Sequence, residues 1–234
     1  MKMILPTEVK QVKDYPVNLR LDDEQVVIVG GGRVAYRKLR RLLEFSCLIR
    51  LISPRLDERI EPLLIDERID YIAREFRASD LEGAFLVFAA TDDDQLNREI
   101  SELSGADALV NVADANELST FTLPAVVSEG KLTLAVSTGG ASPALSRQIR
   151  KKLTDEFGSE YGEYLNFVYY LRRNILQHID DTEKRRKILK KLGDLELVDL
   201  FITDRDEAIS KIRQLVQEKA EISPDVIFQG VKIR

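Results

Sequence analysis

The sequence predicts an α/β protein with a doubly wound parallel sheet, followed by a small β segment and a helical region. Short, continuous apolar runs alternate with helix-like stretches through the first hundred residues. That alternation is typical of parallel strands that are buried on both faces and connected by helices. A glycine-rich turn separates the first run from the first helix, and long amphipathic stretches replace the strands from residue 142 onward.

The strands are expected where apolar and β-branched residues run together. These runs are VVIVG at 26–30, LIRLIS at 48–53, FLVFAAT at 85–91 and ALVNVAD at 108–114, with a weaker strand at 69–76. Apolar residues at helical spacing follow the glycine turn, and DDDQLNREISELS opens a second helix after residue 91. Because a helical crossover joins neighbouring parallel strands with a fixed hand, this order predicts a doubly wound sheet.

The pattern changes after residue 115. The segment at 121–140 has the pattern of two antiparallel strands around a turn at Glu129-Gly130, and Pro124 keeps the first of them at an edge. Amphipathic helices are expected after it, at 143–155, 160–178, 183–191 and 205–220, and a short strand is expected in the tail after Pro224. We therefore expect a nucleotide-binding domain at 1–115, a β segment at 116–141 and a helical domain at 142–234.

Composition excludes several classes of protein. The 234 residues carry 35 basic and 40 acidic side chains, and a net charge of −5 argues against a nucleic-acid binder. Cys47 and His178 are single residues of their kinds, which excludes a disulfide framework and a zinc site built from cysteine and histidine alone. We interpret Cys47 as a small buried hydrophobe and His178 as structural. We also expect Tyr164, Tyr169 and Tyr170, which lie at core-like helical spacing with Phe167, to serve in packing. No apolar run is long enough to span a membrane and the N-terminus has no signal-peptide pattern, so we expect a cytoplasmic protein without membrane partners.

The strongest local motif is the turn at 30–35, which has the pattern G-x-G-x-x-A between a strand and a helix. In this Rossmann-type context Gly30 allows the tight turn, and Gly32 allows the backbone to approach a pyrophosphate. Ala35 allows close helix–strand packing, and the helix N-terminus offers N–H groups to the anion. The predicted cofactor-binding residues of this turn are Gly30, Gly31, Gly32, Arg33, Val34 and Ala35.

Polar residues at the ends of two other strands extend this candidate cofactor site. The second strand ends in Ser53-Pro54-Arg55, without the acidic residue that commonly binds the ribose of NAD. Ser53 can bind a ribose hydroxyl and Arg55 a 2′-phosphate, so the residues alone leave NAD and NADP open, and Arg55 can also be a solvated loop residue. Thr91 and Asp92 are candidates for cofactor contacts, although acidic residues at this point also cap the following helix.

Asp114 is the candidate catalytic residue. It ends the strand VNVAD at the edge where the reactive end of a dinucleotide is expected. A carboxylate there can take a proton while the cofactor takes a hydride. The alternative is a turn or helix cap.

A second group of candidates surrounds the loop Ser137-Thr138-Gly139-Gly140-Ala141-Ser142-Pro143. Ser142 is expected to cap the next helix and Pro143 to begin it. Arg147, Arg150 and Lys151 then fall on one helical face, where arginine can pair with substrate carboxylates. The alternative is a solvated surface helix.

Taken together, these motifs resemble the precorrin-2 dehydrogenases of sirohaem biosynthesis, including the N-terminal half of bacterial sirohaem synthase and its yeast counterpart. The resemblance covers roughly residues 15–150. Its motifs are YPVNLRL at 15–21, VVIVGGGRVAYRK at 26–38, FAATDDDQLN at 88–97, NVADANELSTFTLPAVV at 111–127 and LAVSTGGASPALSRQIR at 134–150.

The resemblance implies NAD-dependent oxidation of precorrin-2 to sirohydrochlorin by a homodimer in which the β segment helps dimerisation. It matches the family's essential aspartate to Asp114 and the serine of its V-S-[ST]-G-G loop to Thr138, and it favours NAD at Ser53. It adds Thr138, Ser142, Arg147 and Arg150 as candidate contacts for the many carboxylates of the substrate. No residue is expected to hold a resident metal.

Two alternatives follow from the same residues. In bifunctional family members Asp114 would also serve ferrochelatase activity, with Fe(II) as a substrate. A non-enzymatic NAD-sensing module is the other reading, but such sensors commonly have an acidic residue at the end of the second strand and need neither the NVAD nor the STGGASP loop.

Overall fold

The computed structural model describes residues 14–231, which divide into two compact units, the first ending at Leu123 and the second beginning at Pro124. Residues 1–13, where we expected no signal peptide, and residues 232–234 lie outside the described part of the chain. Each unit has a hydrophobic core of its own.

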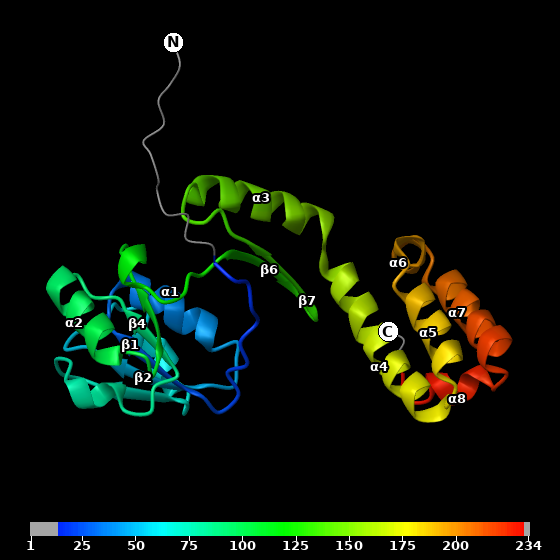
Figure 1. Ribbon diagram of the computed structural model, residues 1–234, viewed down its shortest axis with the longest axis horizontal. Coiled ribbons are helices and arrows are strands. Elements are labelled where there is room, and N and C mark those ends of the chain that lie inside the picture. The colour runs from blue at the N-terminus through cyan, green and yellow to red at the C-terminus, as the bar shows by residue number, and fades with distance from the viewer. Residues whose placement is uncertain (1–13, 232–234) are drawn as a thin grey trace, which may run out of the picture. The chain divides into compact units, whose positions relative to one another are not determined.

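The first unit contains the predicted parallel sheet. Its strands are β1 (Gln25–Val29), β2 (Leu48–Ile52), β3 (Ile69–Ile72), β4 (Leu86–Ala89) and β5 (Leu109–Val112). All four neighbouring pairs are parallel, in the order β3-β2-β1-β4-β5. Figure 1 labels three of these strands, β1, β2 and β4. The predicted Rossmann-type fold is therefore confirmed.

Two helices cover opposite faces of this sheet. Helix α1 (Arg33–Leu42) packs Ala35 and Leu39 against one face, together with Ile28 and Phe88. Helix α2 (Asp94–Ser104) packs Ile100 against the other face. Because successive strand residues point to opposite faces, both faces are apolar, and the strands are continuous apolar runs in the sequence. Short 3₁₀ helices η1 (Glu61–Ile65), η2 (Ala78–Leu81) and η3 (Asn116–Leu118) complete the unit.

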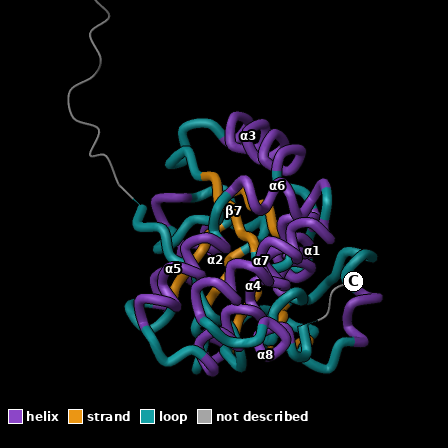
Figure 2. The backbone as a smooth tube through the Cα atoms, turned by 90° about the vertical axis from the view of Figure 1, so that its right-hand side faces the viewer, coloured by secondary structure: helices purple, strands orange, loops and turns teal. Residues whose placement is uncertain are grey.

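The second unit begins with an antiparallel hairpin. Strands β6 (Ala125–Glu129) and β7 (Leu132–Val136) pair around a turn in which Gly130 has φ +58°. This is the predicted hairpin, and Pro124 lies just before its first strand. Helix α3 (Pro143–Glu156) runs along the hairpin (Figure 1), and Figure 2 shows α3 and β7 from the side of the second unit.

The remaining helices of the second unit form a bundle. They are α4 (Ser159–His178), α5 (Thr182–Leu192), α6 (Leu195–Thr203), α7 (Arg205–Ala220) and α8 (Pro224–Phe228). The fully buried Leu171, Ile188 and Ile212 come from three different helices of the bundle. The predicted helices at 143–155, 160–178, 183–191 and 205–220 are confirmed within two residues at each end. The sequence analysis did not predict α6.

Two expectations about this unit were wrong. The described part of the tail after Pro224 forms the short helix α8 rather than a strand, because Ser223 accepts a hydrogen bond from the backbone N–H of Asp225 and Pro224 suits the first helical turn. Residues 232–234 of the tail lie outside the described residues. We also expected Tyr164, Tyr169 and Tyr170 to pack together in the core. Only Tyr164 is buried there, while Tyr169 and Tyr170 remain 48% and 46% exposed.

Asp80 provides a test of the first unit's stability. Its buried carboxylate receives two hydrogen bonds from Arg74, at 2.7 and 2.8 Å, and one from the backbone N–H of Arg77 at 2.8 Å. Arg74 lowers the pKa of Asp80. A lowered pKa contributes stability above the carboxyl's unfolded pKa, and this contribution is lost as pH falls through the folded value.

We expect Asp80→Asn to lower the free energy of unfolding by about 2 kcal/mol at pH 7, since hydrogen bonds to charged groups contribute on this scale. The difference from wild type should shrink as pH falls below about 4, the ordinary pKa of the unfolded carboxyl, and should vanish once the folded carboxyl also gains its proton. Chemical denaturation at several pH values measures both effects. Asp70→Asn is the control, because Asp70 is exposed and meets Arg50 only at 3.8 Å. Equal losses in the two variants would contradict the expectation.

Candidate functional site

The predicted cofactor residues of the first unit follow strands that end side by side. The last residue of β1, Val29, pairs with Ile52 of β2 and Ala89 of β4, and Ala89 pairs in turn with Val112 of β5. Since the strands are parallel, the segments after them meet at the carboxyl edge of the sheet, where α/β proteins bind ligands. The fold thus brings the glycine turn, Ser53, Thr91, Asp92 and Asp114 to one edge, as the sequence predicts.

The three glycines of the turn are needed for two different structural reasons. Gly30 has φ +120°, and a Cβ there would lie 2.2 Å from the carbonyl oxygen of Ala90. A Cβ at Gly31 would lie 2.0 Å from the carbonyl oxygen of Arg55. At Gly32, by contrast, no atom lies within 4 Å of the added Cβ. The first two glycines therefore allow the chain to pack, while the third leaves backbone open to a ligand.

The start of α1 fits an anionic group. Gly32 is its N-cap residue, the first turn has no acidic side chain, and no side chain of the described residues caps its N–H groups. Uncapped N–H groups at a helix N-terminus attract phosphate through both hydrogen bonding and the helix dipole. Arg33 is exposed at the first position, Val34 is partly buried, and Ala35 is fully buried against the sheet. The geometry of the turn fits the pyrophosphate of a dinucleotide.

Ser53 is held within its own loop. It is 6% exposed, and its hydroxyl donates to the carbonyl oxygen of Arg55 at 2.6 Å. The same loop contacts the glycine turn, because the N–H of Asp57 donates to the carbonyl oxygen of Gly31 at 2.7 Å. Arg55 is exposed. The hydroxyl of Ser53 thus shapes the rim of the site, and its contact with a ribose stays a prediction.

Of the acidic residues that follow β4, Asp93 caps the next helix and Asp92 does not. Asp93 is the N-cap of α2, and its carboxylate accepts from the N–H groups of Gln95 and Leu96 at 2.9 and 3.1 Å. Thr91 donates its hydroxyl to the side-chain oxygen of Asn97 at 2.8 Å. Asp92 is exposed and has no part in this cap. Asp92 therefore remains available to a ligand, and its cofactor contact stays a prediction.

Asp114 has an uncommon backbone conformation. It lies two residues beyond β5, is exposed, and has φ +58°. Aspartate tolerates this left-handed region better than most residues other than glycine, but the conformation is still rare outside turns. Such outliers concentrate at turns and functional sites. The turn projects an exposed carboxylate at the carboxyl edge of the sheet, which suits the predicted base.

Lys38 is a residue to which the sequence interpretation gave no role. It extends from α1 to β5, where its ammonium group donates to the side-chain oxygen of Asn111 at 2.9 Å. It also lies 5.1 Å from the ring centre of Phe88. Burial, and secondarily Arg37, lowers the pKa of Lys38 to about 8, while the carboxylate of Asp114 opposes this shift. One feature of the sequence could have indicated this burial. Lys38 lies three residues after Ala35 and four before Leu42, on the face of the helix that is buried.

The remaining predicted residues belong to the second unit. Thr138 accepts a hydrogen bond from the N–H of Ser142 at 3.2 Å, and Ser142 caps α3 by accepting from the N–H of Leu145 at 3.2 Å. The expected cap is therefore confirmed. Arg147 and Arg150 are exposed on α3, as is Lys151. Asp114 belongs to the first unit and these residues belong to the second. Their contact with substrate stays a prediction.

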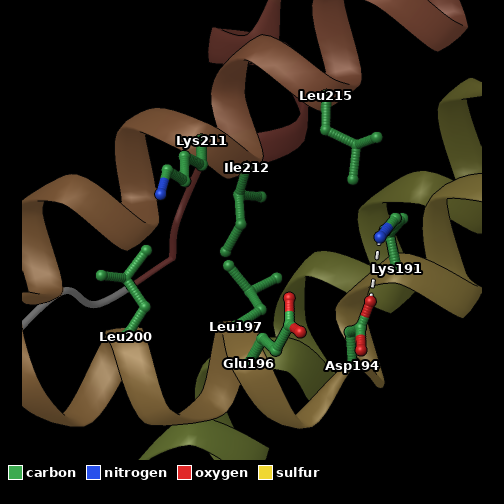
Figure 3. A pocket seen from close by; sticks show the side chains of 8 residues that line it. All are labelled: Lys191, Asp194, Glu196, Leu197, Leu200, Lys211, Ile212 and Leu215. Atoms are coloured by element: carbon green, nitrogen blue, oxygen red, sulfur yellow. Dashed lines mark hydrogen bonds and ion pairs between the residues drawn. The ribbon is translucent and has the colours of Figure 1, made fainter.

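A cavity of about 260 Å³ that opens to solvent lies between α6 and α7 of the second unit (Figure 3). Leu197, Leu200, Ile212 and Leu215 line it, and the ion pair between Lys191 and Asp194, at 2.9 Å, lies at its side. None of the predicted site residues lines this cavity.

Other site types find no support within residues 14–231. No group of three histidine, cysteine, aspartate or glutamate residues there could hold a metal ion. None of the helices in that range is long and apolar enough to cross a membrane. Cys47 is fully buried, as expected, and burial raises the pKa of its thiol. His178 contacts the carbonyl oxygen of Asn174 one turn earlier in α4, which fits a structural role.

Comparisons with known proteins match segments in both units of the chain. A family model described as NAD(P)-binding matches residues 17–125, and one described as the central part of a sirohaem biosynthesis protein matches residues 129–156. The chain is 35% identical over 220 residues to the siroheme synthase of Thioalkalivibrio sulfidiphilus, covering 94% of this chain and 44% of that protein. It is 37% identical to the siroheme synthase of Pseudomonas entomophila, covering 74% of this chain and 38% of that protein.

The chain thus spans less than half the length of these curated relatives. Among solved structures, it is similar to SirC, precorrin-2 dehydrogenase, with a TM-score of 0.74 and 27% identity. This match covers 86% of the present chain and all of that chain. The similarity therefore extends over both units.

The glycine turn generates a paired prediction. Gly32→Val should fold normally, because its φ of −88° suits any residue and its Cβ meets open space, but it should weaken NAD binding about a hundredfold or more by filling the space for the pyrophosphate. Gly30→Ala should instead lower the melting temperature, because of its positive φ and its clash with Ala90. Calorimetric titration with NAD and thermal unfolding separate the two effects. Wild-type NAD affinity in a folded Gly32→Val protein would contradict the placement of the cofactor.

Proposed function

Because the chain belongs to the sirohaem-biosynthesis family that includes the siroheme synthases and precorrin-2 dehydrogenase, we propose that it oxidises precorrin-2 to sirohydrochlorin with NAD. The observation that best supports this proposal is the shared edge of the sheet. The glycine turn after β1 fits a pyrophosphate, and Asp114 after β5 presents an exposed carboxylate at a positive φ. Both segments follow strands that end in register in the sheet.

The two parts of the site divide the work of the reaction. NAD, when bound, supplies the acceptor for a hydride from the substrate. The glycine turn and the start of α1 hold its pyrophosphate, and this orients the rest of the cofactor along the edge of the sheet. Asp114 takes the proton that the substrate releases and passes it to water. One hydride and one proton together account for the two hydrogens that the substrate loses.

We propose that the carboxylates of precorrin-2 are bound from the second unit. Arg147 and Arg150 project from α3 into solvent, and arginine binds carboxylates with two parallel hydrogen bonds. Thr138 and Ser142 belong to the loop that begins this helix, so their hydroxyl and N–H groups lie at its positive end. These residues make up the substrate side of the proposed site, within the helical domain at 142–234.

We propose that the enzyme is a homodimer that works in the cytoplasm, with the segment at 116–141 as the dimerisation element. The β6–β7 hairpin is a sheet of two strands, so each strand leaves one edge without a partner within the described chain. Open edges are common sites of pairing with a second chain. Leu123 and Leu145 beside the hairpin are also 52% and 48% exposed. A monomer by sedimentation at micromolar concentration would contradict this assembly.

The reaction is tested by an anaerobic assay with precorrin-2, adding NAD first and Fe(II) second. Sirohydrochlorin absorbance that forms only with NAD supports the dehydrogenase. A further spectral change with enzyme-dependent iron uptake would add the ferrochelatase activity. Tight NAD binding without any turnover would favour the sensing module instead.

Asp114→Asn is the sharpest variant for the mechanism. Asparagine accepts the positive φ of this position, so the turn should keep its shape while the proton acceptor is lost. We expect kcat to fall by about 10²–10⁴-fold, the usual contribution of general base catalysis, with NAD affinity within about twofold of wild type. Stopped-flow absorbance and NAD titration measure the two quantities. Wild-type turnover by this variant would exclude Asp114 as the base.

A further inference from the structure

Lys38 is a partly buried cation whose contacts do not neutralise it. Its hydrogen-bond partner is the neutral amide of Asn111, and within residues 14–231 no carboxylate lies within ion-pair distance of its ammonium group. A buried charge without a contacting partner is costly, and an apolar side chain would fill the same space at lower cost. The position of Lys38 therefore suggests that its charge is needed.

The contacts of Lys38 lead towards Asp114. Asn111 accepts from Lys38 at 2.9 Å, and its amide donates to the carbonyl oxygen of Phe121 at 3.2 Å. Phe121 packs edge-on against Phe88, whose ring lies beneath the Lys38 ammonium group. These contacts tie together the two ends of the segment 111–121, and Asp114 lies within it.

The charges around Lys38 also single out Asp114. Arg37, on the same helix, disfavours the protonated form of Lys38, and Asp114, beyond β5, favours it. The side chains that meet Lys38 from β4 and β5, Phe88 and Asn111, carry no charge. The negative group whose charge favours the protonated form of Lys38 is therefore the carboxylate of Asp114.

We propose that Lys38 is a positioning residue for the reaction. Its ammonium group holds Asn111 and the segment 111–121 in place, and its positive charge attracts the carboxylate of Asp114, which helps to orient that carboxylate at the edge of the sheet. This inference rests on the proposed function and extends it to a residue outside the cofactor turn.

Two variants of Lys38 separate charge from packing. Lys38→Gln keeps a donor for Asn111 but removes the charge, and we expect kcat to fall about tenfold to a hundredfold, with KM and NAD affinity nearly unchanged. Lys38→Arg keeps the charge and should retain most of the activity. Arg40→Gln, an exposed change on the same helix, is the control and should behave as wild type.

The pH profile distinguishes this role from a merely structural one. Since burial lowers the pKa of Lys38 to about 8, wild-type kcat should decline above about that pH as the ammonium group loses its proton. Lys38→Arg should extend activity to higher pH, because arginine stays protonated. Wild-type kcat in Lys38→Gln, or an unchanged alkaline limb in Lys38→Arg, would overturn the proposal.

A measurement without turnover tests the same coupling. The titration of Lys38, followed by NMR of the labelled lysine side chains, should move to lower pH in Asp114→Asn, because the stabilising carboxylate is gone. An unmoved titration would overturn the inference. If that titration moves while wild type makes no sirohydrochlorin from precorrin-2, the proposed function fails and the coupling of Lys38 to Asp114 stands.

Discussion

The close passage of the first turn against the end of β4 is the constraint on which the candidate site depends. At Gly30 the backbone comes so near to Ala90 that no side chain fits between them. This approach starts α1 directly above the edge of the sheet, beside the ends of β4 and β5. The open space at Gly32, the uncapped N–H groups of α1 and the residues after β4 and β5 then share one edge. Without that approach, the same residues would form an ordinary strand–helix connection.

Two charged side chains of the first unit, Asp80 and Lys38, have different kinds of partner. Asp80 satisfies its buried carboxylate with Arg74 and a backbone N–H, which makes it a structural ion pair. Among the described residues, the ammonium group of Lys38 meets a neutral amide and an aromatic ring but forms no ion pair. Burial penalises both groups, but only the first has a compensating charge in contact. This contrast is the physical reason to assign Lys38 to the chemistry of Asp114 rather than to the stability of the fold.

The helical part of the chain shows where sequence patterns mislead. Residues 225–231 contain β-branched and aromatic residues that favour a strand, yet local capping by Ser223 and Pro224 forms a helix and buries Ile227 and Phe228. Likewise, the spacing of the tyrosines in α4 does not tell which ones face the bundle. Tyr164 does so and donates its hydroxyl to the carbonyl oxygen of Leu192, whereas Tyr169 and Tyr170 remain half exposed. Packing against neighbouring helices decides these cases.

The sequence by itself determined the parallel sheet, the hairpin, most of the helices and the turn that fits a dinucleotide. These features depend on local chemistry: apolar runs long enough for a buried strand, helical periodicity, and glycines where the backbone must turn or be approached. Only the tertiary structure decided that Asp93, rather than Asp92, caps α2 and that the Ser53 hydroxyl is used within its own loop. It also decided that Lys38 reaches across from α1 to Asn111, a residue 73 positions away. The contact between Lys38 and Asn111 joins segments distant in the chain, and no local pattern specifies it, because it exists only once the strands have taken their order in the sheet.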